Sequence, residues 1–378
     1  MRILYVTTLD PNNYIAWSGL TKNIFDCLKK TSHNIRKTGP IRSKVRYIYI
    51  VKRIFYKLFN LRYDADRKIC LSKIYAKKIK VFLNQKNYDL IVTSDTYTVS
   101  YLETDVPIII WTDLTYKSWV DNYFKKKNIL ENSYLEANYL EKLALDKAHK
   151  IFLTSDWAIK DAIKNYGNSA KFNKLEFGSN LNFKLNKDKF LKNLSDKKRF
   201  KICNVISIGV DWKRKGMDTS IKVVDYMNKI GCKTHLTIVG SNQKAKSKNL
   251  SIINFLDKNN NKQKKKLINL IQSSHFNILM SKAEGYGVVF IEASSLGLYN
   301  IAYNVGGVSG AIKNNFNGKL FNKKDNYKVI ARYLVRLFNN KENYNKKSIS
   351  SYNYYHQNIN WTSISDKFNK MINNLIKK

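Results

Sequence analysis

Two glutamates bracket a glycine-bearing loop in the second half of the chain. Glu284 and Glu292 have seven residues between them in the segment SKAEGYGVVFIEASSLG. The preceding HFNILMS has the pattern of a buried strand, and a helical pattern begins near Gly287. A helix N-terminus offers free N–H groups to a phosphate, and glycine lets the backbone approach a ligand closely. Carboxylates accept hydrogen bonds from the paired hydroxyls of a sugar or ribose. The segment therefore predicts a nucleotide-sugar site, although either glutamate alone is also compatible with an ordinary solvent-facing position.

Three consecutive cations form a second candidate cluster. Lys213, Arg214 and Lys215 follow another buried strand and precede Gly216 in SIGVDWKRKGMD. Cationic side chains at the end of a strand suit the charge of a diphosphate. The alternative is a solvated charge run without a ligand.

The elements that must position these residues alternate along the whole chain. Short runs that are apolar throughout, separated by helices, indicate parallel strands covered on both faces and hence a doubly wound α/β fold. The predicted strands are Ile3–Thr7, Leu90–Ser94, Pro107–Trp111, Ile151–Thr154, Val205–Gly209, His235–Val239 and Phe276–Leu279. The predicted helices between them include Ser133–Ala148, Asp156–Tyr166, Met217–Ile230, Gln263–Ser273 and Gly287–Leu296.

The alternation breaks at residues 184–200, which are rich in lysine and lack a strand pattern. We interpret this segment as a linker between a first domain, residues 1–183, and a second domain, residues 201–359. Two such Rossmann-like domains would face each other across a cleft. A ligand would bind at the carboxyl ends of the strands.

The segment from Glu284 resembles the E-x7-E motif of the retaining family-4 glycosyltransferases of the GT-B fold, also called glycosyl transferases group 1. The continuation ASSLGLYNIAYNVGGVSGAI and the later NGKL are similar to the family's segment after that motif. The resemblance covers nearly the whole chain and is densest from 202 to 320. It implies that a terminal helix, residues 360–378, packs back on the first, acceptor-side domain. It also implies transfer of a hexose, without a metal and with retention, from a nucleotide-diphosphate sugar to a hydroxyl of a glycan or lipid-linked acceptor. The pathway would be the synthesis of cell-surface polysaccharide, lipopolysaccharide or glycolipid.

The resemblance also implies roles for individual residues. Glu284 would contact the donor sugar and Glu292 the ribose, while Lys215 and Arg214 would hold the diphosphate. Asp113 stands at a position where the family often has the Asp of a His-Asp pair, and it completes the catalytic candidates. The other positions implied to bind the donor, mostly through backbone groups, are Gly19, Gly209, Gly240, Leu256, Gly285, Tyr286, Gly287 and Val288.

Three positions depart from the family pattern. Val210 replaces an Arg beside the strand-end glycine, Thr112 replaces the His of the His-Asp pair, and Ser18 replaces the first Gly of a Gly-Gly loop. An inactive GT-B-like protein that binds sugar nucleotides or acts as a scaffold is therefore an alternative. An inverting GT-B enzyme is another, which the context of the E-x7-E motif disfavours.

The net charge of the chain is strongly positive, which suggests a polyanionic partner. Among 378 residues, 68 Lys and Arg oppose 28 Asp and Glu, for a formal charge of +40. Nucleic acid, an anionic membrane and phosphate-bearing substrates are the candidate partners. Zinc-finger spacing, an RNP-like aromatic strand and a basic helix-turn-helix pattern are missing from the sequence, which argues against nucleic acid.

Fifteen of these cations lie between Arg36 and Lys80, against only Asp64 and Asp66. In KVRYIYIVKRIFYKLFN, apolar residues recur at helical spacing, and Arg46, Arg53 and Lys57 form a second stripe. This pattern predicts a basic amphipathic helix in an anionic membrane interface, with the three cations facing the membrane. The alternative is a helix that packs its apolar face on a core and leaves its basic face in water.

We expect neither a metal nor a cofactor, because the nucleotide-sugar is a substrate. The four cysteines lack CxxC spacing, and the Asp64-Ala65-Asp66 string lies in a basic segment away from any predicted strand end. The start, MRILYVTTLD, reads as a strand rather than a signal peptide, and no uncharged apolar run reaches the roughly 18–20 residues that span a bilayer. We therefore expect a cytoplasmic protein that is peripheral on the inner face of the plasma membrane.

Overall fold

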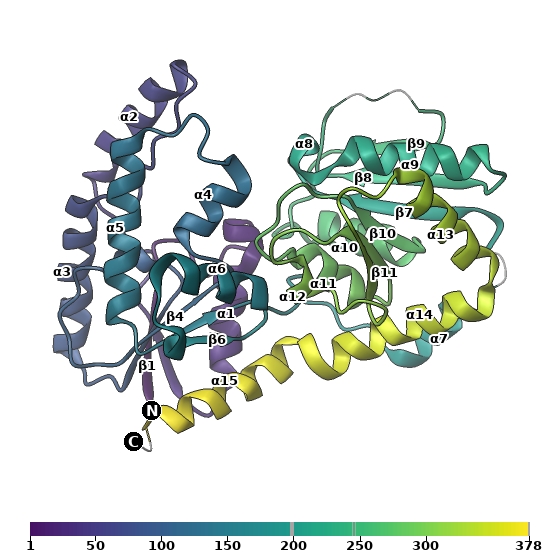
Figure 1. Ribbon diagram of the computed structural model, residues 1–378. Coiled ribbons are helices and arrows are strands. Elements are labelled where there is room, and N and C mark those ends of the chain that lie inside the picture. Colours follow the sequence, from purple (N-terminus) through teal and green to yellow (C-terminus); the bar gives the residue numbers. More distant parts are fainter. Residues whose placement is uncertain (197–199, 244, 246, 377–378) are drawn as a thin grey trace. The chain divides into compact units, whose positions relative to one another are not determined.

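The computed structural model describes residues 1–196, 200–243, 245 and 247–376, which divide into two compact units (Figure 1). The first unit is Met1–Glu176 together with the chain from Ser365 onward, and the second is Phe177–Ile364. Each unit has one six-stranded sheet in which every pairing of neighbouring strands is parallel. This confirms the predicted doubly wound α/β class.

The strands of the first sheet are β1 (Arg2–Val6), β2 (Asn34–Lys37), β3 (Leu90–Thr93), β4 (Ile108–Thr112), β5 (Lys150–Leu153) and β6 (Phe172–Lys174). Those of the second are β7 (Cys203–Ile208), β8 (Thr234–Val239), β9 (Leu250–Ile253), β10 (Phe276–Leu279), β11 (Tyr299–Tyr303) and β12 (Gly318–Phe321). The central strands β3, β4, β10 and β11 are buried along their whole length, as a sheet covered by helices on both faces requires.

The strand order locates the place where a ligand binds in each sheet. The orders are β2-β1-β3-β4-β5-β6 and β12-β11-β10-β7-β8-β9. In each sheet the chain first moves outward on one side of a central strand and then continues on its other side. The order therefore switches between β1 and β3, and between β7 and β10. Ligands of doubly wound sheets bind at the carboxyl ends of the strands beside such a switch point.

The helices of the first unit are α1 (Leu20–Lys29), α2 (Arg46–Leu58), α3 (Ile69–Gln85), α4 (Tyr116–Phe124), α5 (Glu131–Lys147) and α6 (Asp156–Tyr166). Those that begin in the second unit are α7 (Lys187–Ser195), α8 (Trp212–Lys215), α9 (Met217–Lys229), α10 (Asn261–Gln272), α11 (Val288–Ser294), α12 (Val308–Ala311), α13 (Tyr327–Asn339), α14 (Lys341–Tyr354) and α15 (Trp361–Ile376). A π-helical turn, Tyr355–Ile359, separates the last two.

The helix α15 passes from the second unit into the first. Its Ser365 hydroxyl donates to the carbonyl of Cys27, and the Phe368 ring stacks on Trp111 with centroids 5.5 Å apart. The aromatic side chain and the hydroxyl therefore anchor the C-terminal segment on the first unit.

The division of the chain differs from the predicted linker at 184–200. The units separate between Glu176 and Phe177, and part of the predicted linker is the helix α7. Phe190 of α7 is buried and stacks on Tyr352 at 4.4 Å between centroids, which fixes α7 in the second unit. The lysines around two buried apolar residues hide this helix in the sequence. Residues 197–199 of the predicted linker lie outside the described part.

Candidate active site

The loops that follow β7 and β10 meet at the switch point of the second sheet. The β7 loop leads into α8, which ends with Arg214 and Lys215, and the β10 loop carries Glu284. Parallel strands place their carboxyl ends at one edge of a sheet, so these residues come together across 69 positions of sequence. The structure thus assembles three of the four predicted catalytic residues in one cluster.

The Glu284 carboxylate is the centre of this cluster. Lys215 Nζ lies 2.6 Å from Glu284 Oε1, and the Ser281 hydroxyl donates to the same oxygen at 2.7 Å. Arg214 Nη1 lies 3.5 Å from that oxygen and donates to the Ala283 carbonyl at 3.1 Å. Two cations therefore face the Glu284 carboxylate, and Arg214 Nε also lies 3.3 Å from Asp211 Oδ2, so these two cations are balanced by two carboxylates.

Burial and charge act on Glu284 in opposite directions. Burial by itself raises the pKa of the carboxyl, because it penalises the charged form. The positive charges of Lys215 and Arg214, with the hydrogen bonds from Lys215 and Ser281, outweigh it and place the pKa below its ordinary value. Glu284 is therefore an anion at neutral pH and acts as a hydrogen-bond acceptor.

Two glycines and an aspartate fix the cationic loop. The Asp211 side chain caps α8 by accepting from the Arg214 N–H at 3.0 Å. Gly216 ends α8 with a φ of +67°, and a Cβ there would lie 1.9 Å from the Met280 carbonyl oxygen. A Cβ on Gly209 would lie 2.8 Å from Lys215 Cγ. The first glycine lets the cationic loop approach the end of β10, and the second leaves room for the Lys215 stem.

The other predicted donor positions of this unit surround the same edge of the sheet. Gly240 follows β8 with a φ of +103°, and a Cβ there would lie 2.9 Å from the Gly209 carbonyl oxygen. Leu256 is half-buried in the loop after β9. Both loops therefore run along the edge that carries Lys215 and Glu284.

Glu292 is buried in the short helix α11, where Lys258 forms an ion pair with its Oε1. Lys258 comes from the loop after β9 and was not among the predicted site residues. Its position after a strand was the only sequence signal for it, and only the folded sheet brings it to α11. The Glu292–Lys258 pair keeps a second carboxylate in place near the edge of the sheet.

The loop Gly285–Val288 offers backbone groups rather than side chains. Gly287 caps α11 with a φ of +92°, and a Cβ there would lie 2.6 Å from the Phe290 ring. The Tyr286 hydroxyl donates to the Phe177 carbonyl at 3.0 Å, and its ring is buried against the Phe177 ring. The Tyr286 side chain therefore braces the loop, and the helix after it is shorter than the predicted Gly287–Leu296.

The remaining predicted site residues lie in the first unit. Gly19 has a φ of +89° and begins α1, after Trp17 and Ser18, which also have positive φ. Asp113 follows β4, and its carbonyl accepts from the Thr154 hydroxyl at 3.2 Å. Both residues lie in loops that follow strands of the first sheet.

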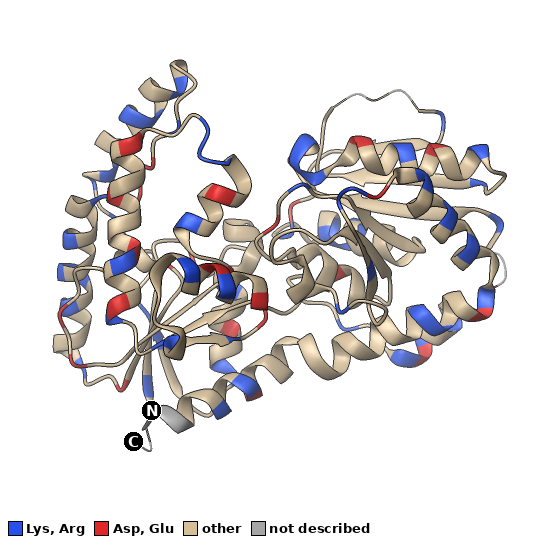
Figure 2. Cartoon of the chain, in the orientation of Figure 1, with Lys and Arg blue, Asp and Glu red and all other residues tan. Residues whose placement is uncertain are grey.

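The predicted basic amphipathic helix exists as α2, and the expected roles of its cations divide. Arg46 forms an ion pair with Asp66, so part of its charge is neutralised within the first unit. Arg53 and Lys57 are exposed and line a pocket of the first unit. Figure 2 shows lysine and arginine along both α2 and α3.

Most of the apolar face of α2 is in solvent. Ile48, Val51, Phe55 and Leu58 are 55–78 % exposed, and no residue of the helix is buried. The half-buried Tyr49 of the same helix packs against the core of the first unit, so α2 contacts that core with only part of its apolar side chains. No helix in the described part of the chain is both long and apolar enough to cross a bilayer.

Solved structures of the same architecture align with nearly the whole chain. Sucrose-phosphate synthase (tll1590) from Thermosynechococcus elongatus has a TM-score of 0.70 at 13% sequence identity, over 100% of this chain and 99% of that one. Anabaena Alr3699/HepE in complex with UDP-glucose has a TM-score of 0.62 at 12% identity, over 99% and 100% of the two chains. WaaG, a glycosyltransferase involved in lipopolysaccharide biosynthesis, has a TM-score of 0.63 at 14% identity, over 98% and 99%. The protein has the GT-B fold.

The sequence of the second unit matches a family model. The family model described as "Glycosyl transferases group 1" matches residues 186–354, which contain Arg214, Lys215, Glu284 and Glu292. The second unit is therefore similar in sequence to the glycosyl transferases group 1 family. No curated protein matches the chain in sequence.

Proposed function

We propose that the protein transfers a hexose from a nucleotide-diphosphate sugar to a hydroxyl of a glycan or lipid-linked acceptor, with retention at the anomeric carbon. The observation that carries this proposal is the cluster of Lys215, Arg214 and Glu284 at the switch point of a unit that is similar in sequence to the glycosyl transferases group 1 family. A similar structure, Alr3699/HepE, is a complex with UDP-glucose, which makes UDP-glucose the first donor to test.

The cluster has the chemistry that such a donor needs. Lys215 and Arg214 would bind the diphosphate and stabilise the charge that develops on the leaving group. Glu284, held ionised by these cations, would accept hydrogen bonds from sugar hydroxyls. Glu292, kept in place by Lys258, would accept from the ribose hydroxyls. Backbone groups of Gly209, Gly240 and Gly285–Val288 would complete the donor site.

The proposed reaction exchanges one bond to the anomeric carbon for another. The bond to the phosphate oxygen breaks, the acceptor oxygen bonds to the same face of the sugar, and the acceptor proton passes to the leaving phosphate. The cationic side chains would take the place of a divalent ion. The DxD aspartates are engaged elsewhere, because Asp64 pairs with Arg67 and Asp66 with Arg46.

Arg214 bears on the alternative of an inactive binding protein. Val210, at the family's usual arginine position, is an exposed apolar residue. Arg214 reaches the Ala283 carbonyl and the Glu284 carboxylate from the next helix instead. This supports a transfer of the arginine's role to Arg214.

Incubation with UDP-glucose tests the proposed function, and hydrolysis or transfer of the donor is expected. If the protein binds a panel of nucleotide-sugars but turns none of them over, the inactive alternative is favoured. NMR of the product anomer distinguishes retention from inversion.

We also propose that the first unit docks on an anionic membrane through α2. The helix presents exposed Ile48, Val51 and Leu58, together with Arg53 and Lys57, which no described carboxylate neutralises in an ion pair. Apolar side chains flanked by cations suit the interface of an anionic bilayer. The acceptor would then be lipid-linked and the enzyme peripheral on the cytoplasmic face.

A further inference from the structure

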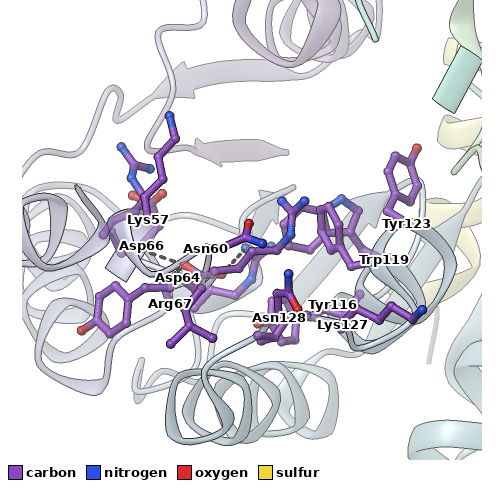
Figure 3. Close-up of a pocket in the computed structure, with 18 residues that line it drawn as sticks. Lys57, Asn60, Asp64, Asp66, Arg67, Tyr116, Trp119, Tyr123, Lys127 and Asn128 are labelled. Atoms are coloured by element: carbon purple, nitrogen blue, oxygen red, sulfur yellow. Dashed lines mark hydrogen bonds and ion pairs between the residues drawn. The ribbon is translucent and has the colours of Figure 1, made fainter. Parts of the chain in front are cut away.

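A pocket of about 600 Å³ opens in the first unit, and none of the residues proposed to bind the donor is among the described residues that line it. Its walls are the last turn of α2, the loop of residues 60–67, and α4 with the turn after it (Figure 3). Lys57 and Asp66 lie toward one end of the pocket, and Trp119 and Tyr123 toward the other. The volume is that of a typical small-ligand site.

The charges that line this pocket do not balance. Its two carboxylates are already paired, Asp64 with Arg67 at 3.2 Å and Asp66 with Arg46. The other lining cations have no carboxylate partner among the described residues, and these are Arg53, Lys57, Arg62 and Lys127. The pocket therefore presents an excess of positive charge to a ligand, and the complementary ligand is an anion.

One wall of the same pocket is aromatic. It consists of Tyr116, Trp119, Tyr123 and Phe124, all from α4. The Arg67 guanidinium lies 4.8 Å from the Tyr116 ring centroid and 5.9 Å from that of Trp119, so rings and cation hold each other in place. Arg62 lies over the Phe124 ring at 4.0 Å. Aromatic faces bind the apolar C–H face of a saccharide ring, whereas an inorganic anion has no apolar surface to place against them.

The rim of the pocket has an unusual backbone. Asn60, Lys125, Lys126 and Asn128 all have φ between +50° and +56°, a conformation that costs energy in residues other than glycine. An isolated β-bridge ties the two rim segments, with the Arg62 N–H donating to the Asn128 carbonyl at 2.6 Å. Backbone strain of this kind persists where surrounding contacts enforce it, and it often marks a binding site.

From these observations we propose that the pocket binds a phosphate-bearing saccharide, the anionic sugar of the lipid-linked acceptor. The phosphate contacts Lys127, which lies toward the same end of the pocket as Trp119 in Figure 3, and the sugar ring lies on Trp119. The assignment to the acceptor rests on the proposed function, while the pocket's preference for a phosphosaccharide does not. Because Arg53 and Lys57 belong to the membrane-docking helix α2, the pocket would receive a head group whose lipid stays in the bilayer.

Calorimetric titration with glucose 1-phosphate, glucose and inorganic phosphate tests the proposal. We expect glucose 1-phosphate to bind at least tenfold more tightly than either part alone. The variants Lys127→Ala and Trp119→Leu should each weaken that binding at least tenfold. The control Lys160→Ala removes an exposed lysine of α6 in the same unit and should change nothing. Lys127 is exposed, whereas Trp119 is half-buried and packs against the core, so thermal unfolding verifies that each variant is folded.

Glucose 1-phosphate is also part of a donor, so the experiment needs a second arm. Lys215→Ala, in the proposed donor site, should leave the binding of glucose 1-phosphate to the pocket intact and weaken that of UDP-glucose. The pocket variants should do the reverse. Equal binding of inorganic phosphate and glucose 1-phosphate, or unchanged binding in the pocket variants, overturns the inference. If every variant, including Lys215→Ala, still bound UDP-glucose as the wild type does, that result would instead count against the proposed donor site.

Discussion

Lys215 Nζ lies 2.6 Å from Glu284 Oε1, although the two residues are 69 positions apart in sequence. Lys215 ends the first short helix after β7, and Glu284 lies in the loop after β10, the strand beside β7. The ion pair therefore joins the two loops of a topological switch point. It keeps a carboxylate ionised and a lysine ordered where the donor diphosphate and sugar are proposed to meet.

Replacing Lys215 tests its proposed role in stabilising the leaving group. We expect Lys215→Ala to lower kcat for transfer by about 10²–10³-fold, the effect of removing one preorganised charge partner. The measurement is steady-state turnover of the donor that the wild-type protein uses. Lys213→Ala, two residues earlier in α8, is the matched control, because no described carboxylate pairs with Lys213. An equal loss of kcat in both variants would mean that Lys215 contributes only to the general positive charge of the loop.

Glu292 is expected to bind the ribose. Its removal should lower the affinity for the donor and leave the fold stable. Glu292→Ala removes the proposed acceptor of the ribose hydroxyls, so UDP-glucose affinity should fall at least tenfold by calorimetry. Glu342→Ala serves as the control because Glu342 is exposed and pairs only with Lys346 on the surface of α14. Unchanged nucleotide affinity in a folded Glu292→Ala protein would contradict the assignment.

The lowered pKa of Glu284 predicts a pH-dependent contribution to stability. A carboxyl whose pKa is lower in the folded state stabilises the fold at pH values above its ordinary pKa of 4.5. This stabilisation is lost as the pH falls through the pKa of the folded state. The melting temperature of wild type should therefore exceed that of Glu284→Gln at pH 7, and the difference should narrow below about pH 4.5. Thermal unfolding of both proteins between about pH 3 and about pH 7 measures this difference in melting temperature. A difference that stays constant with pH would mean that Glu284 contributes no charge.

Two glycines with left-handed backbone form a matched pair for stability. A Cβ on Gly216 would meet the Met280 carbonyl oxygen at 1.9 Å, whereas a Cβ on Gly231, with a φ of +89°, meets nothing within 4 Å. Gly231→Ala should lower the free energy of unfolding by about 1 kcal/mol through backbone strain alone. Gly216→Ala should cost at least about 3 kcal/mol, because the loop must also move away from β10. Chemical denaturation compares them, and similar losses would show that the close approach is unimportant.

Membrane docking through α2 predicts a dependence on both its apolar and its basic side chains. Val51→Glu/Leu58→Glu should abolish co-sedimentation with phosphatidylglycerol vesicles, because both side chains are exposed and would enter the interface. Arg53→Gln should weaken binding and reduce its salt sensitivity. Val329→Glu, at an exposed apolar position of α13, controls for added charge. Equal binding of neutral phosphatidylcholine vesicles would remove the electrostatic part of the proposal.

The central strands were predictable because they are buried on both faces. Strands such as β4 and β10 therefore appear in the sequence as uninterrupted apolar runs. The strands β2 and β6 were not predicted. Both lie at an edge of the first sheet, where one side of the strand has no neighbour, and their sequences NIRK and FNK are largely polar. An edge strand leaves no apolar signature of its own.

The sequence by itself determined the doubly wound class, the members Glu284, Glu292, Arg214 and Lys215 of the proposed donor site, and the basic helix α2, because each has a local pattern. Only the tertiary structure decided which of these residues are partners. It paired Lys215 with Glu284, Lys258 with Glu292 and Arg46 with Asp66. Parallel crossovers bring strand ends together from distant parts of the chain, and no local periodicity records that proximity. The aromatic, basic pocket of the first unit has the same origin, because its walls come from two separate segments, residues 53–67 and 116–129, that share no motif.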